Sequence, residues 1–93
     1  MEKNIVRGLI PKYEKRKSYY GKAILKYKDD MVTLVSYDTD IIKINSMTSE
    51  LEALCNPEDL SNTTLRHLRE FLKQSGLGHI AELTKKEMIE LIF

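Results

Sequence analysis

Apolar and polar residues alternate along the first half of the chain. Between residues 22 and 28, Ala23, Leu25 and Tyr27 share one face, and lysines occupy most of the other. A period of two places one side of a strand in a core and the other side in water. Residues 31–37 follow as a nearly continuous β-prone run, which is typical of a central strand.

Two later segments extend this pattern. Ile42 and Ile44 point one way with Lys43 between them, and Leu51, Ala53 and Cys55 alternate with glutamates in a fourth expected strand. The paired polar residues Asp29-Asp30 and Asp38-Thr39 predict the turns, because short polar side chains bond to nearby backbone groups. Such short connections favour an antiparallel meander. Residues 4–10 are compatible with either a short strand or an extended arm, which ends at Pro11.

The period becomes helical at residue 62. Leu65, Leu68, Phe71 and Leu72 fall on one face of a first helix. Ser61 or Asn62 is expected to cap its start. Its end is expected at Gly76, where Leu77 packs back on Leu72 in a Schellman arrangement.

A capping box predicts the start of a second helix. Thr84 and Glu87 stand three residues apart, with Leu83 and Met88 at the flanking staple positions. Between the two helices, His79 is expected in a loop.

These elements predict one α+β domain over residues 1–93. We expect a small antiparallel sheet of three to five strands, with two C-terminal helices packed on one face, because both carry apolar surfaces that must be buried. The parts are a basic arm and loop (1–18), a meander (20–55) and a two-helix unit (62–92). No apolar run approaches the length of a membrane helix, and residues 1–4 lead into no secretory signal. With a single cysteine, this predicts a protein of a reducing cytoplasm.

The net charge of +1 hides a strong asymmetry. Residues 1–28 carry nine Lys or Arg against two Glu, and residues 29–93 carry six basic and twelve acidic side chains. A polarised surface indicates a charged partner, although the two parts are equally able to neutralise each other on folding.

No catalytic or metal site is expected. Cys55, His67 and His79 do not have the spacing of a nucleophilic or zinc site, and each has a simpler structural interpretation: Cys55 in the core, His67 at its boundary. The aspartates at the turns lack the glycine and the closing glutamate of a calcium loop. We therefore predict a non-enzymatic protein without a cofactor.

The candidate binding residues form two groups. The first interleaves cations with aromatic rings, which suits phosphates and bases of nucleic acid, although solvated loop charges would give the same pattern. The second is a basic stripe on the first helix, and charges on the solvent side of a helix are routine. The residues of the first group are Lys12, Tyr13, Lys15, Arg16, Lys17, Tyr19, Tyr20 and Lys22, and those of the second are Arg66, Arg69 and Lys73.

Residues 60–92 run as helix, Gly-Leu, loop and helix. They are similar to the helix–extended loop–helix modules of the SAP type, which bind DNA. The glycine-bearing extended loop of those modules is replaced here by Gly78-His79-Ile80-Ala81-Glu82.

Three longer stretches resemble an uncharacterised family of small proteins encoded by phages and conjugative elements of Gram-positive bacteria. These stretches span residues 12–23, 36–39 and 63–74. The resemblance implies a habitat in which small proteins neutralise host defences, with anti-CRISPR proteins as the best-known class. By that analogy we expect an inhibitor that binds a host CRISPR effector, a type II RNA-guided nuclease, or its guide RNA or DNA. The alternative is an accessory or regulatory protein that binds nucleic acid through the basic segment and the two-helix unit.

Overall fold

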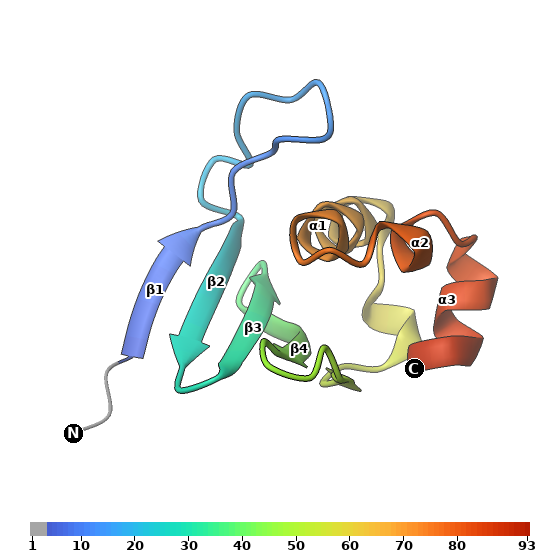
Figure 1. The fold of residues 1–93 in the computed structure, drawn as a ribbon. Helices are drawn as coiled ribbons and strands as arrows, with labels where there is room; N and C mark the ends of the chain where they lie inside the picture. The colour runs from blue at the N-terminus through green and yellow to red at the C-terminus, as the bar shows by residue number, and fades with distance from the viewer. Residues whose placement is uncertain (1–3) are drawn as a thin grey trace.

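Five antiparallel strands form one sheet in the order β1-β2-β3-β4-β5 in the computed structural model, which describes residues 4–93. The strands are β1 (Asn4–Gly8), β2 (Ala23–Lys28), β3 (Met31–Ser36), β4 (Thr39–Asn45) and β5 (Leu51–Ala53). The helices lie to one side of this sheet (Figure 1). The predicted α+β meander is thus confirmed, and residues 4–8 are a strand. Residues 1–3 of the predicted arm lie outside the described residues.

Two boundaries in the sheet differ from the prediction. The second predicted turn lies at Tyr37-Asp38, one residue earlier, because Ser36 pairs with Thr39 and both turn residues take positive φ. Such a two-residue turn matches the twist of its strands. The last strand ends at Ala53, so Cys55 is not part of it, although it packs against the core.

Three helical segments follow a single turn of 3₁₀ helix, η1 (Pro57–Asp59). They are α1 (Asn62–Gln74), α2 (Gly78–Ala81) and α3 (Lys85–Ile92). Ser61 caps α1 by accepting from the Thr64 N–H, and the Thr84–Glu87 capping box starts α3. Gly76 takes φ +80°, and the Leu77 N–H donates to the Leu72 carbonyl over 2.8 Å, which completes the Schellman arrangement.

The short helix α2 was not predicted, since its four residues begin with a glycine and are too few to show an apolar period. It replaces the loop expected around His79. The segment that would match the extended loop of a SAP-type module is therefore helical here. No described helix is long and apolar enough to cross a membrane.

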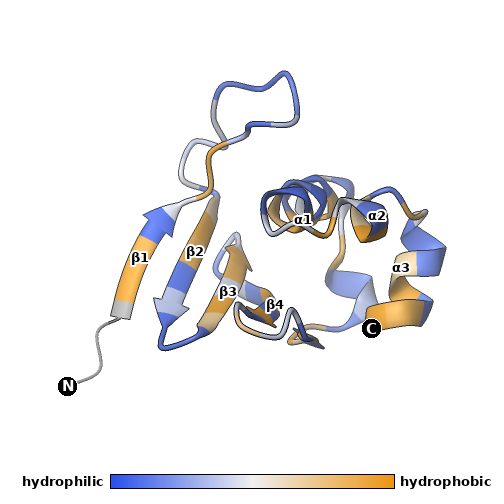
Figure 2. Ribbon diagram, in the orientation of Figure 1, coloured by the Kyte–Doolittle hydropathy of each residue, from blue (hydrophilic) through white to orange (hydrophobic). Residues whose placement is uncertain are grey.

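The core lies between the sheet and the helices, as predicted. Leu34 and Ile42 of the sheet and Leu68, Leu72 and Met88 of the helices are each 0% exposed. The helix-facing row of the sheet, Leu25–Leu34–Ile42, is aligned by the register of three neighbouring strands. Figure 2 shows the hydrophobic sides of α1 and α3 turned inward. A bulge between Leu34 and Val35 lets Ile41 join this core beside Ile42.

Residues 9–22, here called the basic loop, connect β1 to β2 and contact α1 along its length, from Gln74 to Arg66. They form no strand or helix, as expected for a loop. Both ends of the loop are anchored in the core, because Leu9 is 3% exposed and Tyr19 is 5% exposed. The charged residues between these anchors are held above the sheet and helix (Figure 1).

Candidate functional site

The basic loop is fastened to α1 by a buried glutamate. Glu70 is 2% exposed, and its Oε1 accepts from the Tyr13 backbone N–H over 3.0 Å. Its Oε2 accepts from Gln74 Nε2 over 2.6 Å, and the same amide also donates to the Ile10 carbonyl. The two contacts to the loop, at Tyr13 and Ile10, each span more than fifty residues of sequence, so periodicity could not reveal them.

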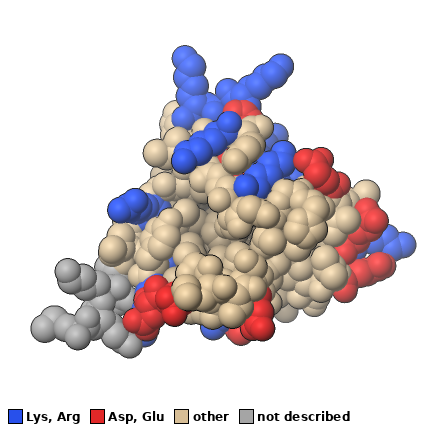
Figure 3. Space-filling view, in the orientation of Figure 1, with Lys and Arg blue, Asp and Glu red and all other residues tan. Residues whose placement is uncertain are grey.

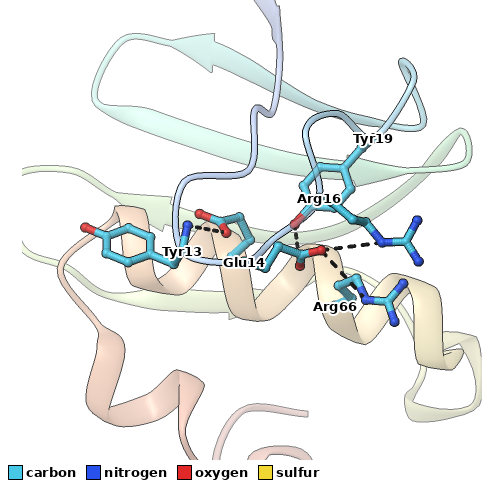
Figure 4. A network of polar contacts seen from close by, with 6 residues as sticks. Tyr13, Glu14, Arg16, Tyr19 and Arg66 are labelled. Carbon is cyan, nitrogen blue, oxygen red and sulfur yellow. Dashed lines mark hydrogen bonds and ion pairs between the residues drawn. The ribbon is translucent and has the colours of Figure 1, made fainter.

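Glu14 forms a second point of attachment (Figure 4). Its carboxylate accepts from the Tyr19 hydroxyl over 2.8 Å and lies 3.5 Å from Arg16 Nε and 3.9 Å from Arg66 Nε. Arg16 comes from the loop and Arg66 from α1. One acidic side chain therefore brings two of the predicted binding cations together, from segments fifty residues apart.

The predicted loop cations all lie at the surface. Lys12, Lys15, Arg16, Lys17 and Lys22 are exposed, and Lys12, Lys15 and Lys17 form no ion pair among the described residues. Figure 3 shows Lys and Arg side chains gathered over the loop, while acidic side chains lie at the other margins of this face. The polarity seen in the sequence is thus present on the surface.

The tyrosines divide into two kinds. Tyr13 is 60% exposed and Tyr20 is 81% exposed, whereas Tyr19 is a core residue that packs edge-on against His67 at 4.6 Å. Burial, and then the hydrogen bond to Glu14, raise the pKa of Tyr19. Tyr19 was predicted as a binding residue, but its ring is not available to stack on a base in this structure.

Tyr37 supplies a third exposed ring that the sequence did not identify. It is 48% exposed at the turn between β3 and β4, with Lys22 Nζ 5.6 Å from its ring centre. In the sequence, Tyr37 is a lone tyrosine beside an aspartate in a turn, which does not indicate a binding residue. Tyr37 comes close to the loop only through the pairing of β2 with β3.

The three basic residues of the stripe on α1 have different roles. Arg66 is exposed and belongs to the Glu14 cluster. Arg69 borders the same hollow as Arg66 and Tyr13, but its guanidinium donates to the carbonyls of Ala81 and Leu83 and so satisfies the end of α2. Lys73 forms an ion pair with Glu82, with 3.8 Å between Nζ and Oε1. The structure thus joins Arg66 to the basic loop and gives Arg69 a role in holding the helices.

Two hollows lie where the loop meets α1. A shallow one of about 260 Å³ is bordered by Tyr13, Glu14, Arg66 and Lys73. A smaller notch of about 70 Å³ is bordered by Arg16, Tyr20, Lys22, Tyr37 and Arg66. The notch combines three cations with two exposed aromatic rings, which is the chemistry that accepts a phosphate beside a base.

A buried polar cluster lies beneath this notch. His67 Nδ1 is 2.8 Å from Ser36 Oγ, which is also 3.1 Å from Thr64 Oγ1. His67 was expected at the core boundary but is 2% exposed, and burial lowers its pKa. Ser36 is 1% exposed and does not border the notch. Its hydroxyl therefore supports the position of His67 rather than facing a substrate.

The remaining candidates for a catalytic or metal-binding role are Cys55 and His79. Burial, followed by Asp59, raises the pKa of the Cys55 thiol, so the reactive thiolate is disfavoured. His79 is exposed on α2. Within residues 4–93, no three His, Cys, Asp or Glu side chains are grouped as metal ligands would be.

The fold and this surface define a small α+β domain with an exposed basic and aromatic face. Residues 8–90 match the model of a family of unknown function, DUF8033, and the chain belongs to that family. No curated protein and no solved structure matches the chain.

Proposed function

We propose that this protein is a non-enzymatic binding protein whose basic loop and the adjoining part of α1 bind nucleic acid. The observation that carries the proposal is the placement of three exposed rings, Tyr13, Tyr20 and Tyr37, among the cations of one surface. Exposed tyrosines have apolar area to cover, and a base covers it by stacking.

The arrangement favours single-stranded nucleic acid over a regular duplex. Rings can stack only on bases that are not already stacked within a helix. Lys12, Lys15 and Lys17 are free to pair with phosphates along the same strand. The domain presents no long helix to a major groove from this surface, because the exposed part of α1 is partly covered by the docked loop.

A pair of charge reversals tests the loop. Lys15→Glu with Lys17→Glu should weaken binding to a labelled single-stranded oligonucleotide, and should reduce the slope of log K against log salt by about 1.4, or ~0.7 per phosphate contact. The matched control is Lys85→Glu with Lys86→Glu, which reverses two exposed lysines on α3. Equal affinities for the two double variants would contradict the proposal.

The aromatic contribution is tested separately. Tyr20→Ala should cost about 1 to 3 kcal/mol of binding free energy, the usual contribution of one base stacked on an aromatic ring. Met47→Ala is the control, since Met47 is 77% exposed and comes from the β4–β5 connection. The measurement is fluorescence anisotropy at one fixed salt concentration.

We also propose, as the second candidate, an inhibitor of a host RNA-guided nuclease of type II. The observation that favours it is the separation of charge: on the face shown in Figure 3, most acidic side chains lie at the right and lower margins, away from the basic loop. Such nucleases offer a positively charged channel together with bound nucleic acid, so a polarised domain complements both. The resemblance to mobile-element proteins supports the same setting.

Affinity capture distinguishes the two candidates. The tagged protein is recovered from a CRISPR-bearing host, with and without nuclease treatment of the lysate. A nuclease subunit retained after treatment supports the inhibitor. Recovery of nucleic acid alone, lost on treatment, supports the nucleic-acid-binding accessory protein.

A further inference from the structure

Strand β1 has an open side along the edge of the sheet. The Leu9 N–H donates to the Ala23 carbonyl, and the antiparallel register continues through Arg7–Leu25 and Ile5–Tyr27. Because inward and outward backbone groups alternate along an antiparallel strand, the N–H and C=O of Val6 and Gly8 point away from β2. These groups have no partner strand among the described residues.

The side chains of this edge are unusually apolar for an unpaired strand. Ile5 is 46% exposed and Val6 is 59% exposed, on opposite faces of β1. Figure 2 shows this hydrophobic segment at the outer edge of the molecule, away from the helices. Natural proteins usually protect such an edge with proline, a bulge, a covering element or charged side chains, and of these the described part of β1 has only the single charge of Arg7.

A hollow of about 590 Å³ runs beside the edge on the face of the sheet that the helices do not cover. Its floor is the cross-strand row Val6–Lys26–Thr33–Lys43, fixed by the strand register. The hollow is also bordered by Asp29, and Lys26 in its floor is paired with Asp40 over 3.0 Å. Arg7 lies on the other face of β1, beside Ile5, and forms no ion pair among the described residues. An incoming segment therefore meets backbone donors and acceptors, apolar surface and positive charge together.

We propose that β1 is a docking edge for an extended acidic segment of a partner protein, which adds to the sheet as a sixth strand. Backbone hydrogen bonds to Val6 and Gly8 would fix the segment, apolar side chains would cover Val6 on one face of the sheet, and carboxylates would approach Arg7 on the other. This surface is separate from the basic loop, so the inference does not depend on the proposed function.

The charge of the edge decides between occupants. A second copy joined through β1 would bring the Arg7 side chains of two edges close together, which like-charge repulsion disfavours. A nucleic acid would gain little from Ile5, Val6 and a row of alternating donors and acceptors. In an extended peptide with alternating apolar and acidic residues, the backbone pairs with β1, the apolar residues lie over Val6 on one face, and the carboxylates lie beside Arg7 on the other.

The probe is a short acetylated peptide of alternating valine and glutamate, with its valine–lysine counterpart for comparison. We expect the acidic peptide to bind the full chain and to slow amide hydrogen exchange at Val6 and Gly8. Equal binding of the two peptides, or protection confined to other strands, would overturn the proposal.

Val6→Pro tests the backbone contact, because it removes an outward N–H and leaves the hydrogen bonds to β2 in place. It should weaken the acidic peptide by about tenfold, the equivalent of one hydrogen bond. Val6→Thr keeps the branched shape and the N–H, and should bind like the wild type. A folded Val6→Pro variant that binds equally well contradicts the inference.

Arg7→Glu tests the charge preference of the edge even if Val6→Pro fails to fold. Arg7 is exposed, and its Cζ lies 6.0 Å from the centre of the Tyr27 ring. The substitution should weaken binding of the acidic peptide and strengthen binding of the lysine peptide. If Arg7→Glu left the preference for the acidic peptide unchanged, the edge would not take an acidic strand. The same conclusion would follow if the wild-type protein sedimented as a dimer and Val6→Pro abolished that dimer.

Discussion

The basic loop and the helix-on-sheet core are ordered by different forces. In the core, Leu34, Leu68 and Met88 are fully buried, and apolar packing determines their positions. In the loop, only the two ends are buried, and the middle is held by polar contacts to Glu14 and Glu70. The side chains that offer chemistry to a partner are therefore largely distinct from those that maintain the fold. Binding and stability should respond to different substitutions.

The largest effect is expected in the core. Leu68→Ala should lower the free energy of unfolding by about 2 to 5 kcal/mol, because a fully buried leucine leaves a cavity against the sheet. Urea denaturation followed by circular dichroism measures the change. A loss below about 0.5 kcal/mol, the range of ordinary surface substitutions, would mean that α1 does not pack as described.

A smaller and more local loss is expected where the loop meets α1. Glu70→Ala leaves the Tyr13 N–H without its buried acceptor, which should cost about 1 to 3 kcal/mol. Amide exchange at Tyr13 should accelerate more than exchange in β3. Glu82→Ala is the matched control, because its carboxylate is 75% exposed in a loose pair with Lys73, and such pairs contribute little. Equal losses for the two variants would show that the loop is not fastened by Glu70.

A pH-dependent loss of stability is expected from His67. Burial is the main reason that its folded-state pKa lies below the ordinary 6.5; Arg66 and Arg16 act in the same direction, and Glu14 opposes them. The unfolded chain therefore binds the proton more readily. This contribution to stability is complete above about pH 6.5 and is lost as the pH falls below it. Urea midpoints at about pH 7.5 and about pH 5.5 measure the slope.

His67→Gln should flatten that slope, since the amide does not titrate over this range. His79→Gln, which replaces the exposed histidine of α2, is the matched control substitution. A variant at residue 67 that keeps the full pH dependence would assign the effect to other groups.

The smallest effect is expected from substitution of Cys55 and His79. Cys55→Ser combined with His79→Ala should leave affinity for single-stranded nucleic acid within about twofold, since neither residue borders the candidate interface. The same anisotropy assay measures it. Loss of binding by a folded double variant would place one of these side chains at the functional surface.

Local signals in the sequence were sufficient for much of the fold. Ser61, Gly76 and the Thr84–Glu87 pair each determine a helix boundary through neighbouring backbone groups, and all act as predicted. Period-two alternation identified β2, β4 and β5, because successive side chains of a strand point to opposite faces. The four-residue helix α2 was missed because it is too short to show a period.

The site depended on contacts that no local pattern contains. Glu70 looks like an ordinary surface charge of a helix, yet it is buried beneath the loop, and Ser36 reaches His67 across 31 residues. Tyr19 and Tyr20 are adjacent in sequence, but one is in the core and the other is 81% exposed. Composition located the basic and aromatic segment, and only the packing of the loop on α1 determines which of its side chains face outward.

Tyr20 and Tyr37 both have left-handed backbones, with φ of 55° and 51°. That conformation costs a residue other than glycine roughly 1 to 2 kcal/mol. A search for thermostable variants would therefore tend to replace these two tyrosines with glycine or asparagine, and each such gain would delete an exposed ring beside the cationic notch. At these two positions, selection for heat resistance and selection for binding should lead to different sequences.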